Sequence, residues 1–426
     1  MRGGLFATVA IAALCVGAGG ALWLALRDKE PSLPPAVEAP AQPAAPMVIV
    51  PPAPPAEATV EVPGGEGTVI PVATPETRTL SDAALRDVIA FAGRTRSAAL
   101  LVWQAGALQV EHYAEGVRPF DRIDGAGLQV ALLVMLTGRA IQDGHIPDLE
   151  TPVSTWLPEW RDDPRGRIAV RDLVQGTSGL DAPPGPPSGA VADWTLSATL
   201  GAAPGTRYAP AMIDMQVLAL VLSRATGRPL VDYLSAALWQ PLGARAAELT
   251  LDRPGGDPLT YCCVAATPRD WLRIGLALLE GGAVDGRQVV PTAWVDAMTK
   301  PTLFSRHHGM RTHLVWPVEP QMPFRAAERF VEADTVFLAG DGGQRLYVSR
   351  GAELVILRLG AIVDDWDESV LPNIVARGIQ MPTRPGRRVP AGQGVELPPI
   401  TKPPPIPSVE AVPLDAQPAG PAPAKP

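Results

Sequence analysis

The serines of the chain do not stand at the spacing from a lysine that would supply a base for nucleophilic catalysis. A serine attacks a carbonyl when a nearby base takes its proton, and a lysine three residues later on a helix lies on the same face as the serine. None of the four lysines stands at this spacing: the residues three positions before Lys29, Lys300, Lys402 and Lys425 are Leu26, Ala297, Pro399 and Ala422. The chain therefore contains no Ser-x-x-Lys pair.

The cysteines and histidines do not have the spacing of a metal site. No cysteine stands near any of the five histidines, which are His112, His145, His307, His308 and His313. We therefore expect no zinc and no other cofactor, and we predict a surface loop for the histidine pair at 307–308. Cys262 and Cys263 are adjacent, and a disulfide between neighbours requires a strained ring, so we predict two buried thiols.

Composition excludes one broad class of function. The chain carries 36 basic and 44 acidic residues, so its net charge is −8, and no basic stripe with interleaved aromatic residues is present. Nucleic acids bind basic surfaces, and we therefore expect no nucleic-acid partner.

Proline divides the chain into a folded part and two arms. Most of the 49 prolines stand between residues 31 and 75 or after residue 382, where the sequence is typical of extended polyproline segments. We therefore predict an anchor at 1–30, a proline-rich disordered linker at 31–77, one globular domain at 78–381 and a proline-rich disordered tail at 382–426.

Residues 5–26 form an uncharged apolar run, flanked by Arg2, Arg27 and Lys29, that is long enough to cross a bilayer as a helix. A cleaved signal peptide is the alternative, but the small residues 19–21 are followed by more apolar residues rather than by a cleavage pattern. We expect a single-pass protein of the inner (cytoplasmic) membrane with its domain on the periplasmic side.

The folded part has strand patterns at both ends and helical patterns between them. β-rich runs at 98–104 and 108–113, and at 345–349 and 353–359, predict two hairpins. Apolar periodicity predicts helices at 129–142, 213–225 and 229–239, and Thr267 followed by Pro268 predicts the start of another. Terminal strands around a helical middle indicate an α+β fold in which both hairpins share one antiparallel sheet.

Several longer strings appear in a fixed order along this part. They are GRAIQDG (138–144), PVSTWLPEW (152–160), VRDLVQGTSGL (170–180), APGTRY (203–208), WQPLG (239–243), ATPRDWLRIG (266–275) and GDGGQRLYV (340–348). Together they resemble the serine β-lactamase and penicillin-binding-protein superfamily, and within it the branch of esterases and 6-aminohexanoate-dimer hydrolases. The resemblance implies the β-lactamase/transpeptidase-like fold and acyl transfer by a Ser-x-x-Lys pair at the start of the first buried helix.

The catalytic residues that the resemblance implies are missing. Counting back from residue 138 places the serine and the lysine at Gly127 and Val130, and no serine or cysteine stands between residues 97 and 154. The second motif remains only as Tyr208, followed by Ala209 and Pro210. The third, usually Lys-Thr-Gly or His-x-Gly, reads Leu-Ala-Gly at 338–340.

These observations favour a pseudoenzyme that binds a peptide, muropeptide or protein at the old cleft. The expected ligand-binding residues are Tyr208, Gly340, Asp341, Gly342, Gly343 and Gln344. Because Gly127 and Val130 are smaller and less polar than serine and lysine, we expect a wider, uncharged cleft floor. Two alternatives stay open: a hydrolase with non-standard residues, for which Ser178 is the candidate nucleophile, and a structural or protein-interaction module tethered by the proline-rich arms.

Overall fold

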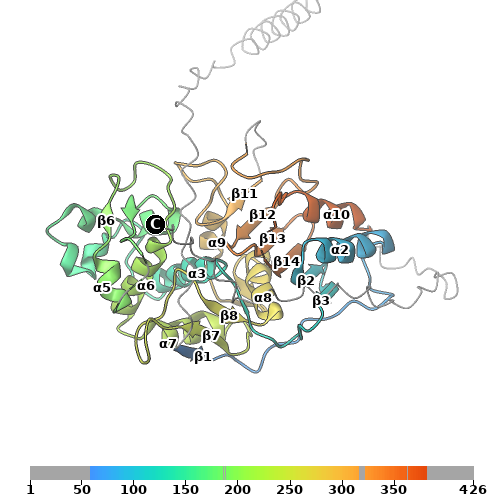
Figure 1. Ribbon diagram of the computed structural model, residues 1–426, viewed down its shortest axis with the longest axis horizontal. Helices are drawn as coiled ribbons and strands as arrows, with labels where there is room; N and C mark the ends of the chain where they lie inside the picture. Colours follow the sequence, from blue (N-terminus) through green and yellow to red (C-terminus); the bar gives the residue numbers. More distant parts are fainter. Residues whose placement is uncertain (1–57, 186, 188, 316–321, 362, 381–426) are drawn as a thin grey trace, which may run out of the picture. The chain divides into compact units, whose positions relative to one another are not determined.

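The computed structural model describes residues 58–185, 187, 189–315, 322–361 and 363–380. Its main sheet has six antiparallel strands and joins the two ends of the domain (Figure 1). In spatial order the strands are β11 (His313–Leu314), β12 (Val336–Ala339), β13 (Arg345–Ser349), β14 (Leu354–Gly360), β2 (Ser97–Gln104) and β3 (Ala107–Tyr113). The predicted α+β class, both hairpins and their shared sheet are confirmed.

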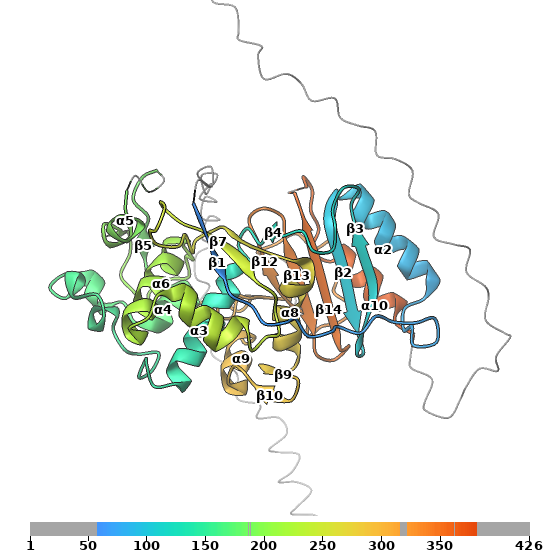
Figure 2. The same ribbon diagram turned by 90° about the horizontal axis from the view of Figure 1, so that it is seen from below.

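Helices cover both faces of this sheet (Figures 1 and 2). Helices α2 (Asp82–Arg94) and α10 (Val370–Gly378) pack over one face, and α8 (Pro268–Leu279) packs against the other. Neighbouring residues of β2 serve the two cores, because side chains alternate along a strand: Leu100 joins the cluster under α2 and α10, and Leu101 joins the larger cluster that contains α8. This compact unit ends at Ile379.

Helix α8 begins as the sequence predicts and lies very close to the sheet. The Thr267 hydroxyl accepts a hydrogen bond from the Asp270 N–H at 3.3 Å, and Pro268 occupies the first turn. Gly275 allows the close approach, since a Cβ at this position would lie 2.4 Å from Cγ1 of Val355 in β14.

The helical middle of the chain packs around the buried helix α3 (Gln129–Gln142), which has the predicted bounds. The next two predicted helices are α6 (Ile213–Thr226) and α7 (Leu230–Leu234), and α7 continues into one π-helical turn at Ser235–Trp239. The shorter elements are α4 (Val170–Gln175), α5 (Val191–Leu196), α9 (Thr292–Met298), three 3-10 turns (Val153–Thr155, Pro158–Trp160 and Pro164–Arg167), and the two-residue strands β5 (Leu180–Asp181), β6 (Thr199–Leu200), β9 (Ala283–Val284) and β10 (Arg287–Gln288).

A second antiparallel sheet was not predicted. Its order is β1 (Thr59–Val62), β7 (Ala247–Thr250), β8 (Val264–Ala266) and β4 (Ile123–Asp124). Val62 and Ile70 are buried in the main core. The prediction that the linker extends to residue 77 is therefore wrong for residues 58–77, which are part of the domain.

Two further expectations are corrected. Cys262 and Cys263 form a disulfide rather than two thiols, and Cys263 takes the positive φ of 74° that the tight turn requires. His307 and His308 are buried rather than exposed in a surface loop, because the loop folds back against β11 and helix α9.

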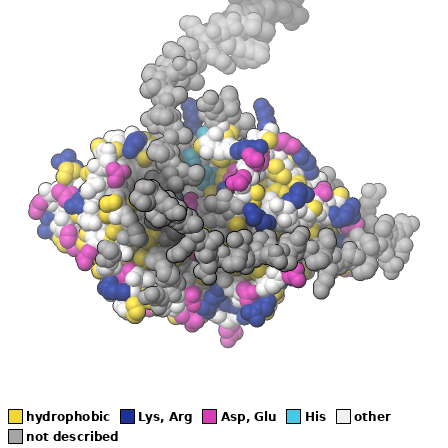
Figure 3. Space-filling model, in the orientation of Figure 1, with side chains coloured by type: hydrophobic (Ala, Val, Ile, Leu, Met, Phe, Trp, Pro, Cys, Tyr) yellow, Lys and Arg dark blue, Asp and Glu magenta, His cyan; other side chains and the backbone are white. Residues whose placement is uncertain are grey.

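The predicted anchor at 5–26 and the predicted tail at 382–426 lie outside the described residues. Within the part of the chain that is described, no helix is long and apolar enough to span a bilayer. On the face shown in Figure 3, acidic and basic side chains are interspersed rather than grouped by sign.

Candidate functional site

The position expected for the nucleophile lies in a short loop between β4 and α3. In this 125–127 loop, the Asp124 carboxylate accepts the Ala126 N–H at 2.8 Å, and Gly127 has a φ of +121° that favours glycine. Val130 stands in the first turn of α3, where it is half-buried and packs against the main core. Gly127 and Val130, the positions at which sequence analysis expects a Ser-x-x-Lys pair, thus lie at the end of this loop and in the first turn of α3.

The 125–127 loop is closed against the 340–344 turn, which connects β12 to β13. A Cβ on Gly127 would lie 2.7 Å from the Gly340 Cα, and a Cβ on Gly340 would lie 2.6 Å from the Ala126 carbonyl oxygen. Both distances are too short for any side chain, so the two backbones are in direct contact. The expectation of a wider cleft floor is not met at Gly127, because the Gly340 backbone lies in the space that a Cβ would take.

Gln129 binds the backbone N–H of Gly127, a donor that an acyl-transfer site at this position would need to keep free. Its side-chain oxygen accepts the Gly127 N–H at 2.8 Å, and the side chain is buried. In serine hydrolases the N–H of the nucleophile is commonly one of the donors that stabilise the oxyanion. Here that N–H is already bonded within the chain.

The 340–344 turn uses much of its hydrogen-bonding capacity internally. The Gly340 N–H donates to the Gln344 carbonyl at 2.8 Å, and the Gly343 N–H donates to the Gly340 carbonyl at 3.0 Å. The Gly342 N–H faces the Ala126 carbonyl at 3.5 Å, and the Gln344 amide donates to the Asp124 carbonyl at 3.2 Å. The expected ligand-binding glycines therefore hold the turn on the 125–127 loop, whereas the side chain of Asp341 is exposed.

Tyr208 is half-buried and stacks on His308, with 4.3 Å between the ring centroids. His308 contacts His313, which stacks on Phe337 of β12, so aromatic rings connect Tyr208 to the main sheet. Burial raises the pKa of Tyr208 to about 12 and lowers that of His308 to about 4. Near neutral pH the tyrosine hydroxyl therefore stays protonated and is a poor general base.

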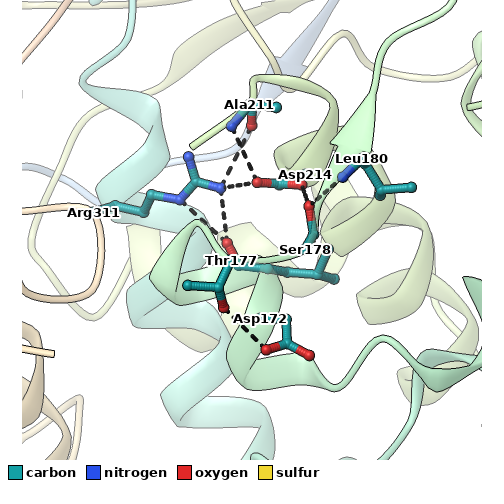
Figure 4. Close-up of polar contacts among 8 residues, drawn as sticks. Asp172, Thr177, Ser178, Leu180, Ala211, Asp214 and Arg311 are labelled. Carbon is teal, nitrogen blue, oxygen red and sulfur yellow. Dashed lines mark hydrogen bonds and ion pairs between the residues drawn. The ribbon is translucent and has the colours of Figure 1, made fainter. Parts of the chain in front are cut away.

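Ser178, the alternative nucleophile, belongs to a buried polar network (Figure 4). Its side chain is fully buried, donates a hydrogen bond to the Asp214 carboxylate and accepts the Leu180 N–H at 3.1 Å. Its position argues against attack on a substrate, because the side chain is inaccessible and its proton is bonded to a carboxylate. The serine instead connects the segment after α4 to the start of α6.

Asp214 and Arg311 form the centre of that network (Figure 4). They make an ion pair in which the Asp214 and Arg311 side chains are 0% and 6% exposed. Arg311 also donates to the Leu173 carbonyl at the end of α4, at 2.9 Å. Burial raises the pKa of Asp214, and the guanidinium opposes this shift. Sequence reasoning missed the pair, although an acidic residue at the start of the apolar helix 213–226 was a usable signal.

No group of three or more histidine, cysteine, aspartate or glutamate side chains among the described residues could hold a metal ion. The site geometry thus has three parts: a closed contact between two backbones, a half-buried tyrosine with its stacked histidine, and the buried ion pair of Asp214 and Arg311.

Comparison with known proteins identifies the family. The family model described as Beta-lactamase matches residues 81–364, and the chain belongs to this family. A 6-aminohexanoate-dimer hydrolase of Paenarthrobacter ureafaciens is 29% identical over a 231-residue alignment, and the match covers 47% of this chain and 56% of that protein. The match therefore spans little more than half the length of that relative.

Solved structures show the same fold. A putative 6-aminohexanoate-dimer hydrolase from Bacillus anthracis superposes with a TM-score of 0.59 at 17% identity, covering 71% of this chain and 85% of that one. A class C β-lactamase from Rhodobacter sphaeroides gives a TM-score of 0.51 at 17% identity, covering 70% and 97%. The β-lactamase/transpeptidase-like fold is confirmed.

We predict that Arg311→Met destabilises the domain by about 3–5 kcal/mol, because it leaves the Asp214 carboxylate buried without its partner. Arg325→Met is the matched control: the Arg325–Asp365 pair is exposed, so its loss costs at most about 1 kcal/mol. Urea unfolding of both variants measures the difference. Equal losses of unfolding free energy in the two variants would contradict the role assigned to the buried pair.

Proposed function

We propose that this chain is a catalytically silent member of the Beta-lactamase family that is tethered to the membrane and binds a ligand or partner. The observation that carries the proposal is the contact between Gly127 and Gly340. At this contact, backbone atoms fill the position expected for the nucleophile. No serine or cysteine stands between residues 97 and 154 to replace it.

The nucleophile, the base and the oxyanion donor that acyl transfer requires are each missing or already bonded at the expected positions. The nucleophile and base positions hold Gly127 and Val130, and the Gly127 N–H that would stabilise an oxyanion is bonded to Gln129. Tyr208 keeps its proton near neutral pH because burial raises its pKa. A family scaffold that retains its packing without these groups is suited to recognition rather than turnover.

Binding at the old cleft then depends on its rim rather than its floor. The Tyr208 hydroxyl has no hydrogen-bond partner in the described ranges, and the Asp341 side chain is exposed on the 340–344 turn. These two groups can accept and donate hydrogen bonds to a peptide, a muropeptide or a protein segment. The backbone N–H groups of Gly340 and Gly343 contribute less, because they are bonded within the turn.

The direct test is covalent labelling of the wild-type protein. Intact-mass spectrometry after incubation with penicillin or with a fluorophosphonate probe is expected to show no added mass, since the expected nucleophile position holds Gly127 and its N–H is bonded to Gln129. Gly127→Ser with Val130→Lys restores the motif, yet it too is expected to remain unlabelled and to melt at a lower temperature, because the new Cβ meets Gly340.

A stoichiometric adduct on one serine or threonine of the wild type would sink the proposal of a silent enzyme. An adduct found only in the folded double variant, on the serine introduced by Gly127→Ser, would instead mean that the two backbones separate easily, and the closed-floor argument would fall.

Membrane attachment rests on the apolar run at 5–26. The full chain is expected to resist carbonate extraction from membranes, and a chain lacking residues 1–30 is expected to be released by it. An alkaline phosphatase fusion after residue 45 is expected to be active, since this reporter folds only outside the cytoplasm. Release of the full chain by carbonate, or an inactive fusion that is stably made, would reverse this part of the proposal.

A further inference from the structure

A pocket of about 180 Å³ lies between the segment 68–71, helix α8 and strand β9. It shares no lining residue with the site around Gly127, Tyr208 and Gly340. Its walls include Ile70, Pro71, Trp103, Leu276, Glu280 and Asp285. The segment 68–71 belongs to the stretch that sequence patterns had assigned to the linker, so this pocket was not foreseeable from the predicted domain boundary.

The size of the pocket restricts its ligand. Sites for cofactors and drug-sized molecules usually enclose roughly 300–1,000 Å³, whereas this pocket is smaller and open to solvent. It can receive one or two small rings of a ligand whose remainder lies on the surface. The surface beside it is apolar, because Val69 and Val72 are 87% and 56% exposed. An extended peptide fits this combination better than a compact small molecule.

Trp103 provides an aromatic ring and an indole N–H donor for such a peptide. It is half-buried at the pocket wall, and its indole N–H has no hydrogen-bond partner among the residues that the structure describes. Aromatic-lined grooves recognise proline-rich segments, because the polyproline helix presents flat rings to the aromatic side chain and leaves its carbonyls unpaired for a donor.

The rim of the pocket is acidic. Glu280 and Asp285 are both exposed, and neither forms an ion pair with another described residue. Arg273 at the pocket floor is buried, pairs with Asp270 at 3.3 Å and donates to the Thr68 hydroxyl at 2.5 Å. Its attraction to Asp285 is weaker than its attraction to Asp270, so the rim keeps its negative charge. Two carboxylates beside an apolar cavity favour a ligand that carries cations next to its rings.

We propose that this pocket docks an extended, proline-rich segment of a partner protein that carries arginine side chains. Prolines enter the cavity against Trp103, a peptide carbonyl accepts the indole N–H, and arginines pair with Glu280 and Asp285. This interaction is independent of the old cleft and does not rest on the proposed loss of catalysis.

Fluorescence anisotropy of a labelled nonapeptide, PPRPPRPPP, titrated with the full chain in detergent, tests the proposal. We expect saturable binding, and no binding of PPEPPEPPP, whose charges are reversed. Glu280→Gln with Asp285→Asn is expected to weaken binding about three- to ten-fold. The matched control, Asp87→Asn with Glu115→Gln, changes the net charge equally at exposed acids outside the pocket and is expected to bind as the wild type does.

Ala283→Trp fills the pocket from its β9 wall and is expected to abolish binding, with an unchanged melting temperature as evidence of folding. If Ala283→Trp fails to fold, the comparison of the two double variants at exposed carboxylates still tests the proposal. Absence of saturable binding by the wild type, or equal weakening by the two double variants, would overturn the proposal.

Discussion

The contact between the backbones of the 125–127 loop and the 340–344 turn is the constraint on which the proposed function depends. An acyl-transfer site needs space for a nucleophilic side chain and for a substrate carbonyl. Here Gly127 and Gly340 approach so closely that a Cβ on either would collide with the other segment. On the proposed function, the position expected for a serine is therefore closed by backbone rather than left open. The backbone of the 340–344 turn covers that position, and the Gln129 side-chain oxygen accepts the Gly127 N–H.

A buried electrostatic network connects the helical part of the domain to the loop that precedes β11. Arg311 joins the end of α4, the start of α6 and the loop that precedes β11, through Leu173 and Asp214. The same loop carries His308, on which Tyr208 stacks. A charge buried without its partner is far more costly than a lost surface pair. The network therefore holds the loop that carries His308, and the ring stacking on His308 in turn positions Tyr208.

Much of the fold was predictable because local signals agree with the global structure. Helix α3 is apolar on nearly every face, and Thr267 with Pro268 specifies the start of α8, so both have the predicted positions. The absence of Ser-x-x-Lys was equally visible. The contact between the 125–127 loop and the 340–344 turn was not predictable. The two segments are more than 200 residues apart in the sequence, and no sequence pattern indicates how close they lie in space. Strand β1 was missed for a similar reason: its pairing with β7 outweighs the proline-rich composition around it.

Amide hydrogen exchange of the Gly127 N–H, followed by NMR, tests the closed junction most directly. Gly106, at the open tip of the β2–β3 hairpin, is the reference, because no atom crowds it. If the Gly127 N–H is bonded to buried Gln129 beneath the 340–344 turn, its exchange should be slower than that of Gly106 by about two orders of magnitude or more. Equally fast exchange at the two glycines would show that the donor is available to a ligand, and would contradict the account of a sealed site.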